Sequence, residues 1–318
     1  MDLSLTRPDA TTTQVTVTCD GQQSHTFDLS TLPPDAVTGL RRPPVDPVAY
    51  GKALYAALFP QGSPAQQAVA EKPKRILLVA ADDVLDALPW EYAYGPRSFL
   101  ACTCSFVRGL PANEQIAPLD RLSGLHISAV ASGPLDHHLP PLNIQSEWLQ
   151  LSEMVGGLDH AVTLERVWPP TIERLRSLVA NQQQRVVHFM GHGGQNEQGE
   201  AVLCFEQDSG EREDITASEF VQRVQSDVLL VTLNACQSAT PGETVFGNLA
   251  KALVREQVPY ALGMRFKIHD DDALAFSRAF YSDFARGVPV EEAVRQARLT
   301  LAFRQRETRL AYRCLNRD

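Results

Sequence analysis

The sequence contains no continuous apolar run close to the about 20 residues that a helix needs to span a bilayer. It also lacks the basic and then apolar N-terminal pattern of a secretory signal peptide. Its six cysteines are scattered, with no CxxC pair and no disulfide framework. These absences predict a soluble, cytoplasmic protein whose thiols stay reduced, and they predict no association with a membrane.

Positive charge is scarce as well, because 29 Lys and Arg residues stand against 38 Asp and Glu residues, which gives a net charge of −9. Binding to nucleic acid depends on clustered Lys and Arg that neutralise phosphates. The only basic cluster, Arg295 to Arg317, is typical of a solvated helix face. We therefore expect no direct nucleic-acid partner.

From residue 125 onward, apolar runs alternate regularly with helical patterns. Thr216 and Glu219 form a capping-box pattern that opens one of these helices. The expected strands cover residues 125–131, 161–166, 185–190, 228–233 and 259–264. Such alternation predicts an α/β fold, in which a mostly parallel sheet carries helices on both faces.

The first part of the chain has a different pattern. Residues 14–19 and 24–29 flank the turn dipeptide Asp20-Gly21, which predicts a β-hairpin. A proline-rich connector and a helix ending near Phe59 follow. We expect residues 1–72 to form a small accessory unit on a main domain of residues 73–318.

The stretch Asp227 to Ala239, DVLLVTLNACQSA, begins as a strand buried on both faces and then presents Cys236. Ligands of open α/β sheets bind at this carboxyl edge. Cysteine is also among the residues most often buried. The loop-like sequence Gln237 to Gly242 favours an exposed thiol over a packed one.

A second strand has the same design, because RVVHFMGHGG at 185–194 ends in His192 between glycines. Glycines there let backbone N–H groups approach a ligand closely. A thiol and an imidazole at the tips of two parallel strands are the minimum for a nucleophile with its base, although position alone leaves ordinary packing open. His188, inside the strand, is expected to pack or to hydrogen-bond within the sheet.

HFMGHGG at 188–194, followed by LNACQSA at 233–239, resembles the histidine and cysteine motifs of the CHAT domain, a caspase-like family related to caspases, separase, legumain and gingipains. Leu88-Pro89-Trp90-Glu91 resembles the family's PWE segment. The resemblance covers residues 45 to 303. Arg265-Phe266 replaces a tryptophan-proline pair of many members. The further strand of many members is not apparent, so either the chain is a fragment of a longer protein or its sheet edge differs.

The resemblance implies a caspase-like, six-strand-type sheet and a cysteine endopeptidase in which Cys236 is the nucleophile and His192 assists proton transfer. The backbone N–H groups of Gly193 and Cys236 would hold the oxyanion. No cofactor and no third acidic residue are implied. Family members act in bacterial defence or signalling, where an upstream activator releases the protease on protein substrates that include gasdermin-like pore formers and CRISPR-associated partners. The alternative is a catalytically silent adaptor of the same fold.

The segment Phe266 to Asp272 is a candidate for contacting the substrate, because it follows the next strand at the same sheet edge. In separase-like relatives, an aspartate near this place contacts a basic residue before the cleaved bond. The hypothesis is that Asp270, with Asp272 as the second choice, selects Arg or Lys at this position of the substrate. The alternative is that these aspartates cap the helix 272–285, with Asp272 the better cap.

Two further motifs are interpreted as structural. Asp136-His137-His138 has proline flanks and no fourth ligand, which favours a surface loop, so no metal site is predicted. Gly191 to Gly194 lacks the spacing and helix onset of a phosphate loop, which argues against a nucleotide-binding, flavodoxin-like domain. Glu206 to Asp214 is expected to be a charged, solvated loop, with Arg212 as a candidate processing site.

Overall fold

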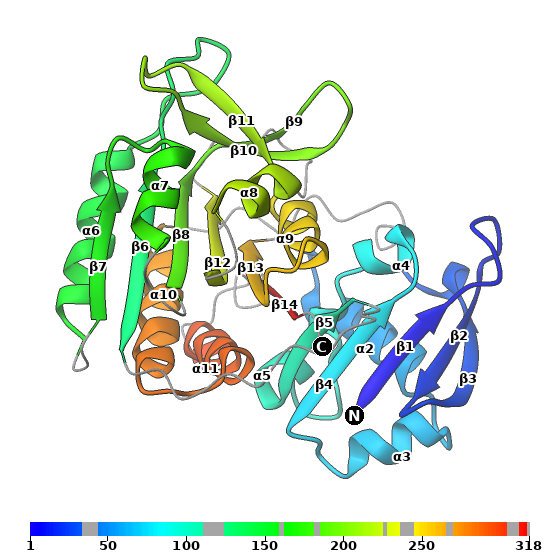
Figure 1. Ribbon diagram of the computed structural model, residues 1–318. Helices are drawn as coiled ribbons and strands as arrows, with labels where there is room; N and C mark the ends of the chain where they lie inside the picture. Colours follow the sequence, from blue (N-terminus) through cyan, green and yellow to red (C-terminus); the bar gives the residue numbers. More distant parts are fainter. Residues whose placement is uncertain are drawn as a thin grey trace.

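The computed structural model describes residues 1–33, 44–110, 124–158, 162–180, 185–224, 228–235, 245–264, 270–303 and 312–316 (Figure 1). Strands alternate with helices along most of this chain. Within these ranges, no helix combines the length and the hydropathy of a membrane span.

One large sheet runs through the molecule and contains eleven of the described strands. In spatial order they are β3 (Gln22–Asp28), β2 (Gln14–Cys19), β1 (Asp2–Thr6), β4 (Arg75–Ala80), β5 (Ser105–Gly109), β14 (Tyr312–Asn316), β13 (Tyr260–Met264), β12 (Val228–Ala235), β8 (Arg185–Gly191), β6 (Leu125–Ala131) and β7 (Val162–Val167). The six strands from β14 to β7 form a unit that is parallel except for β14. The predicted mostly parallel, six-strand-type sheet is therefore confirmed.

Strand β14 corrects one expectation, because no further strand is apparent in the sequence after the last helix. It pairs antiparallel with β13 and parallel with β5, so it lies inside the sheet. Its sequence, YRCLN, is short and mixes polar with apolar residues. The continuous branched-apolar run that marks a buried parallel strand is missing, so the sequence pattern does not predict a strand here.

The N-terminal residues extend the same sheet. The predicted hairpin is present as β2 and β3, and Asp20 in its turn has a positive φ of 48°. Strand β1 pairs with β2 on one side and lies parallel to β4 on the other, which joins the hairpin to the rest of the sheet. The division of the chain at residue 72 stays a prediction.

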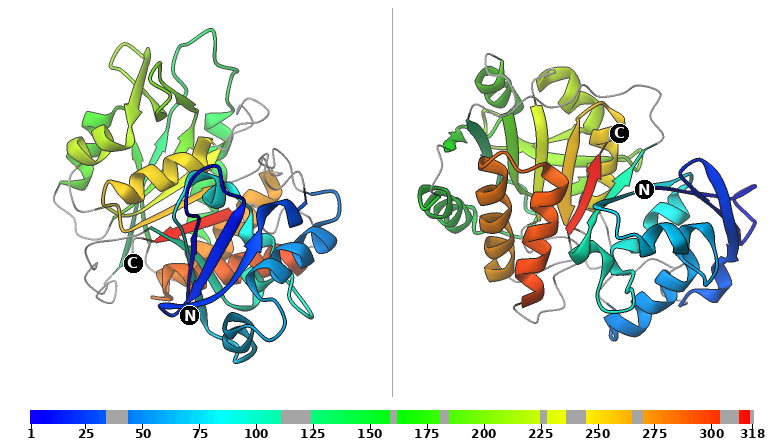
Figure 2. Two further views of the ribbon diagram at one scale, coloured as in Figure 1. Left: turned by 90° about the vertical axis from the view of Figure 1, so that its right-hand side faces the viewer. Right: turned by 90° about the horizontal axis from the view of Figure 1, so that it is seen from below.

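Helices cover both faces of the sheet (Figure 2). One face carries α6 (Ile144–Gly156), α10 (Asp270–Ala285) and α11 (Val290–Phe303), and the other carries α7 (Ile172–Val179), α8 (Ala217–Val224) and α9 (Val245–Arg255). Alternate side chains of a strand point to opposite faces. Accordingly, Val186 and Met190 of β8 join one hydrophobic cluster, whereas Val187 and Phe189 join the other.

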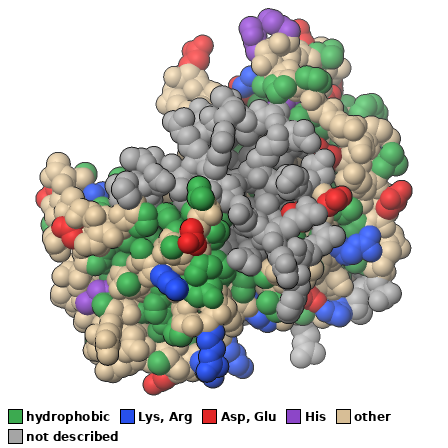
Figure 3. Space-filling view, turned by 180° about the vertical axis from the view of Figure 1, so that it is seen from behind, with side chains coloured by type: hydrophobic (Ala, Val, Ile, Leu, Met, Phe, Trp, Pro, Cys, Tyr) green, Lys and Arg blue, Asp and Glu red, His purple; other side chains and the backbone are tan. Residues whose placement is uncertain are grey.

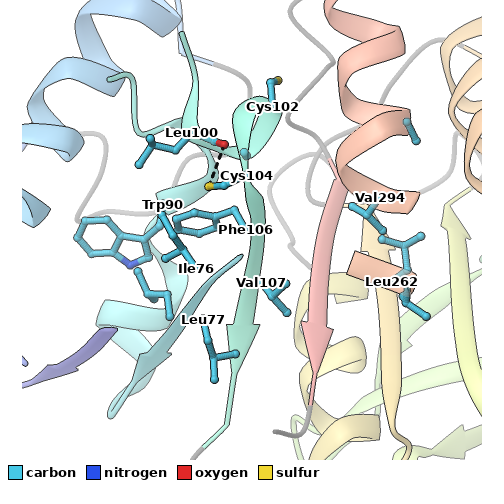
Figure 4. Packing of buried hydrophobic residues seen from close by; sticks show 14 of the residues in the cluster. Ile76, Leu77, Trp90, Leu100, Cys102, Cys104, Phe106, Val107, Leu262 and Val294 are labelled. Atoms are coloured by element: carbon cyan, nitrogen blue, oxygen red, sulfur yellow. Dashed lines mark hydrogen bonds between the residues drawn. The ribbon is translucent and has the colours of Figure 1, made fainter. Parts of the chain in front are cut away.

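The remaining helices fall within the first 103 residues, among strands β1 to β5. They are η1 (Leu29–Thr31), α2 (Pro47–Leu58), α3 (Pro64–Ala70), α4 (Asp83–Ala87), η2 (Trp90–Tyr92) and α5 (Leu100–Thr103). Helix α2 starts where Asp46 accepts hydrogen bonds from the N–H groups of Val48 and Ala49, with Pro47 at its first position. Figure 4 shows part of the apolar core here, in which the side chains of Ile76, Trp90 and Phe106 lie beside one another.

A buried ion pair fixes the segment that contains Trp90. Arg108 of β5 donates from Nε and Nη2 to the two carboxylate oxygens of Glu91, at 2.8 and 2.7 Å. Both side chains are at most 2% exposed. Arg108 also donates to the carbonyl oxygens of Asp86 and Leu88. The fork of the guanidinium thus satisfies a buried carboxylate and two buried carbonyl groups.

A second, three-stranded sheet follows β8 and consists of β9 (Gly193–Gln195), β10 (Ala201–Glu206) and β11 (Arg212–Thr216). Residues 206–214 are therefore not a solvated loop throughout, because Glu206 pairs with Arg212 across the β10–β11 hairpin. The predicted capping box is confirmed at the start of α8, where Thr216 and Glu219 bond each other's backbone N–H groups.

Candidate active site

His192 stands between β8 and β9, at the upper edge of the sheet in Figure 1. The chain passes close to its neighbours just before this residue. A Cβ on Gly191 would meet the Phe189 ring at 2.9 Å and the Ser132 carbonyl oxygen at 3.0 Å. Only glycine fits position 191 without a shift of backbone, so the glycine before His192 has a packing reason.

The register of the sheet aligns the two strands that carry the motifs. Strands β8 and β12 are parallel neighbours, and Gly191 is the partner of Ala235. His192 and Cys236 are the next residues after this aligned pair. Neighbouring strands lie about 4.8 Å apart, so both strands end at one place on the sheet edge. Cys236 lies outside the described residues, as do Phe266 to His269.

His192 is 4% exposed. One of its ring N–H groups donates to the carbonyl oxygen of Pro140, and its own carbonyl oxygen accepts from Cys204 at 3.0 Å. Burial lowers the pKa of His192 below its usual value, and the positive charge of Arg212 lowers this pKa further. The Pro140 carbonyl and the Asp136 carboxylate oppose this shift. The ring is therefore mostly neutral near pH 7 and can accept a proton.

Arg212 of β11 holds the loop that bears Pro140. Its Nε and Nη2 donate hydrogen bonds of 2.7 and 2.9 Å to the two carboxylate oxygens of Asp214. Its Nη1 lies 3.2 Å from Oδ2 of Asp136. These acceptors hold the pKa of Arg212 above its ordinary value. Arg212 thus acts as an ordered clamp, and its place in β11 argues against the processing site considered above.

Sequence reasoning missed both Arg212 and Pro140 as parts of the site. Arg212 and Asp214 are two residues apart on a strand, so they share a face, and this spacing was an available signal. Pro140 contributes only a carbonyl oxygen, which every residue has. No pattern in the sequence marks it.

Gly193, a predicted oxyanion donor, is the first residue of β9 and pairs with Leu203. Antiparallel pairs alternate between those that exchange hydrogen bonds and those that do not. His192 bonds Cys204, and Asn196 bonds Glu200, so the bonded pairs fall on even positions here. Gly193 therefore occupies a non-bonded position, and its N–H points away from β10.

The two aspartates considered for substrate selection open α10. The helix begins at Asp270, two residues earlier than predicted, so Asp272 sits in the first turn and not at the cap. Asp272 is fully buried. The side chain of Asp270 lies outside the described part of the chain. Acidic residues in a first helical turn are favoured by the helix dipole in any case.

His188 behaves as expected of a histidine within the sheet. Its Nδ1 is 2.7 Å from the Tyr281 hydroxyl and 2.8 Å from Thr232 Oγ1, and these two hydroxyls lie 3.0 Å apart. Burial lowers the pKa of His188 to about 4. It forms a buried polar cluster behind the sheet edge, not a group at its surface.

Among the described residues, one group could hold a metal ion. Asp136, His137 and His138 offer ligand atoms that all lie within 4.8 Å of one another. They follow β6 and stand beside the β10–β11 hairpin. The four cysteines with described side chains, Cys19, Cys102, Cys104 and Cys204, are buried free thiols, and burial raises the pKa of Cys204 to about 12.

The profile of the CHAT domain matches residues 48–314 of the 318. Comparison with proteins of curated function found no match. The similar solved structures include two of the separase–securin complex from Saccharomyces cerevisiae, with 18% identity and TM-scores of 0.47 and 0.48. They cover 76% of this chain but only 16% and 15% of the separase chain.

A third similar structure is the Arg-specific cysteine proteinase gingipain R, with 10% identity and a TM-score of 0.44. The match covers 84% of this chain and 66% of that chain. This chain thus spans a small part of separase and about two thirds of gingipain R. The strand order and the profile match together confirm the predicted caspase-like α/β fold.

Proposed function

Because the chain belongs to the CHAT domain family, we propose that it is a cysteine endopeptidase that cleaves a protein partner. The register that pairs Gly191 with Ala235 carries this proposal, because it ends both motif-bearing strands at the same place. A caspase-like family membership makes a thiol nucleophile the expected chemistry. The residues assigned to it are Cys236 and His192.

In the proposed reaction, His192 takes the proton of the Cys236 thiol, and the sulfur attacks the scissile carbonyl carbon. The C–N bond then breaks, and His192 returns the proton to the leaving amine. Water hydrolyses the resulting thioester and restores the thiol. The neutral state of the buried His192 ring supports its role as the first base. The Pro140 carbonyl would orient the ring, so no acidic third residue is needed.

The oxyanion would be held by the backbone N–H groups of Gly193 and Cys236. The non-bonded position of Gly193 in β9 supports this assignment, because its N–H is not used by the β9–β10 ladder. A donor of this kind contributes on the order of 3 kcal/mol to the transition state.

For specificity, we propose that Asp270, with Asp272 as the second choice, selects a basic residue before the cleaved bond. Asp270 starts α10, which follows β13 at the same carboxyl edge. The full burial of Asp272 favours Asp270 as the contact. Asp270→Asn should lower kcat/KM for Arg and Lys peptides by about tenfold or more, with neutral peptides unaffected. Asp271→Asn is the matched control, and a library cleaved equally well at neutral residues would contradict the acidic pocket.

The wider role that we propose is cytoplasmic, in a bacterial defence or signalling system. An upstream activator would release the protease on a protein substrate, such as a gasdermin-like pore former or a CRISPR-associated partner. The burial of His192 favours a need for activation, because a substrate must reach this ring. The same burial also favours the second candidate function, a catalytically silent adaptor.

A thiol-directed peptidyl inhibitor separates the two candidates. We expect mass spectrometry to find the inhibitor on Cys236 of the wild type, none on Cys236→Ala, and much less on His192→Ala. Cys19→Ser, which changes a buried thiol outside the site, is the control and should be labelled like the wild type. Labelling that persists in Cys236→Ala would contradict the proposal. If neither the wild type nor any variant is labelled, with or without candidate activators, the result favours the adaptor.

A further inference from the structure

The loop after β6 gathers two imidazoles and a carboxylate at one point. The ligand atoms of Asp136, His137 and His138 lie within 4.8 Å of one another. The two histidine rings lie with their centroids 3.8 Å apart and their planes tilted by 43°. Both histidines are exposed, and histidine side chains stand at the upper tip of the molecule when it is seen from behind (Figure 3). An ion in solution can therefore reach the group.

The loop is held in place before any ion binds. The N–H of Leu135 donates to the Gly210 carbonyl at 2.8 Å, which ties the loop to the β10–β11 turn. Within the loop, the N–H of Leu139 donates to the Asp136 carbonyl at 3.1 Å, and that of His138 donates to Oδ1 of Asp136 at 2.9 Å. Less conformational entropy is lost when an ion orders ligands that already share one turn.

The carboxylate has the outer support that metal ligands usually have. Oδ2 of Asp136 accepts from Nη1 of Arg212 at 3.2 Å, and this bond orients the carboxylate. Ligating carboxylates are commonly hydrogen-bonded in this way.

We propose that Asp136, His137 and His138 bind a divalent transition-metal ion of the zinc type. Imidazole nitrogen suits zinc, nickel and copper, and one carboxylate oxygen completes three protein ligands. The fourth ligand that the sequence lacks is not required, because water fills that position in zinc sites with three protein ligands. Magnesium and calcium, which prefer all-oxygen sites, are not expected to bind here.

The site is connected to His192 through the chain. Pro140, whose carbonyl accepts the His192 hydrogen bond, lies two residues after His138. An ion bound at Asp136, His137 and His138 therefore restrains the turn at 136–139 further, and with it the acceptor of the His192 ring. This coupling to activity rests on the proposed function, whereas the metal site itself does not.

The metal site is tested in the untagged full chain with Cys236→Ala, so that the candidate nucleophile cannot bind the ion. ZnCl2 is titrated by calorimetry, and CoCl2 is followed by its visible absorption. We expect one ion per chain, with an affinity that falls at least about tenfold in His137→Gln and in His138→Gln. Asp208→Asn, an exposed acid in the neighbouring β10–β11 turn, is the control and should leave the affinity unchanged.

Equal affinity in the parent and in both histidine variants, or no saturable binding, would overturn the metal site. The coupling is tested separately by the rate at which the peptidyl inhibitor labels Cys236. We expect ZnCl2 to change this rate more in the wild type than in His137→Gln, since zinc at the candidate dyad would affect both forms alike. Zinc binding with the same effect on both rates would overturn the coupling and leave the metal site standing.

Discussion

Nη1 of Arg212 and Oδ2 of Asp136 lie 3.2 Å apart, and this ion pair joins the β10–β11 hairpin to the loop that orients His192. The two side chains are 26% and 15% exposed, so water screens the pair only in part. Arg212 also holds Asp214, which makes one guanidinium responsible for two carboxylates. The position of the Pro140 carbonyl therefore depends on a residue more than 70 positions away in the chain.

Arg212→Gln should loosen this loop and leave two carboxylates close together. We expect the free energy of unfolding to fall by about 1–3 kcal/mol, and inhibitor labelling of Cys236 to slow. Urea denaturation and labelling kinetics check the two effects. Arg223→Gln is the matched control, because Arg223 bridges Glu213 and Glu173 at a more exposed position and should cost less than about 1 kcal/mol. Equal losses in the two variants would contradict a special role of Arg212.

The buried pair of Glu91 and Arg108 gives a prediction about stability. Arg108→Met leaves the Glu91 carboxylate buried without its fork of donors, which should cost about 3–5 kcal/mol. The double variant Glu91→Gln/Arg108→Met removes the stranded charge and should be more stable than Arg108→Met alone. Denaturation midpoints of the set measure the effect. Arg255→Gln, at a 59% exposed side chain, should change little. A double variant no more stable than Arg108→Met would show that charge burial is not the cause.

Stability should also depend on pH through the buried histidines. Burial lowers the pKa of His188 to about 4 in the folded protein, whereas an unfolded histidine has a pKa of about 6.5. Below pH 6.5 the unfolded chain therefore takes up a proton that the folded chain refuses until about pH 4. The free energy of unfolding falls over this window as the pH falls, by up to about 3 kcal/mol. The lowered pKa of His192 acts in the same direction.

Urea denaturation at several pH values between 5 and 7 measures this slope, in a range where most carboxylates remain ionised. We expect a shallower slope in His188→Gln, because this variant has lost one titrating group. His137→Gln replaces an exposed histidine and should keep the slope of the wild type. A slope that His188→Gln does not change would assign the pH dependence to other groups.

Gly51 of α2 lies against the segment of η2. A Cβ at this position would overlap the Tyr92 carbonyl oxygen and would meet the Tyr94 Cβ at 2.8 Å. Because backbone must move, Gly51→Ala should destabilise the fold by about 1–3 kcal/mol or more. Gly156→Ala, at the end of α6 with nothing within 4 Å, should be neutral or slightly stabilising. Thermal unfolding compares the two, and a similar melting temperature for both would contradict the overlap.

The sequence predicted the centre of the fold well, because its strands are buried on both faces. The observed β6 matches the predicted range, and β8, β12 and β13 differ from theirs by one or two residues. Continuous branched-apolar runs allow this accuracy. Strand β14 lacks such a run and was missed. The apolar residues 99–107 are typical of a strand or an edge hairpin, but the segment divides into α5 and β5, since a four-residue helix is too short to show a period.

The sequence predicts only those parts of the candidate site that particular residue types mark. The glycines around His192 and the end of an apolar run before Cys236 were visible as patterns, and the register brings the two strand ends together. The assignment of Cys236, Gly193 and Asp270 to their roles stays a prediction. The spacing of Arg212 and Asp214 on one strand is a local signal for half of the clamp. The bond of Arg212 to Asp136 and the contact of the Pro140 carbonyl join distant segments, which no local pattern encodes.

The position of strand β14 in the sheet has a consequence for folding during synthesis. It lies between β5 and β13, yet it leaves the ribosome after every other strand of the sheet. Until then, the nascent sheet has a gap with an unpaired strand on each side. Open strands of this kind readily pair with other chains, so we expect the nascent protein to need chaperone protection until β14 has emerged.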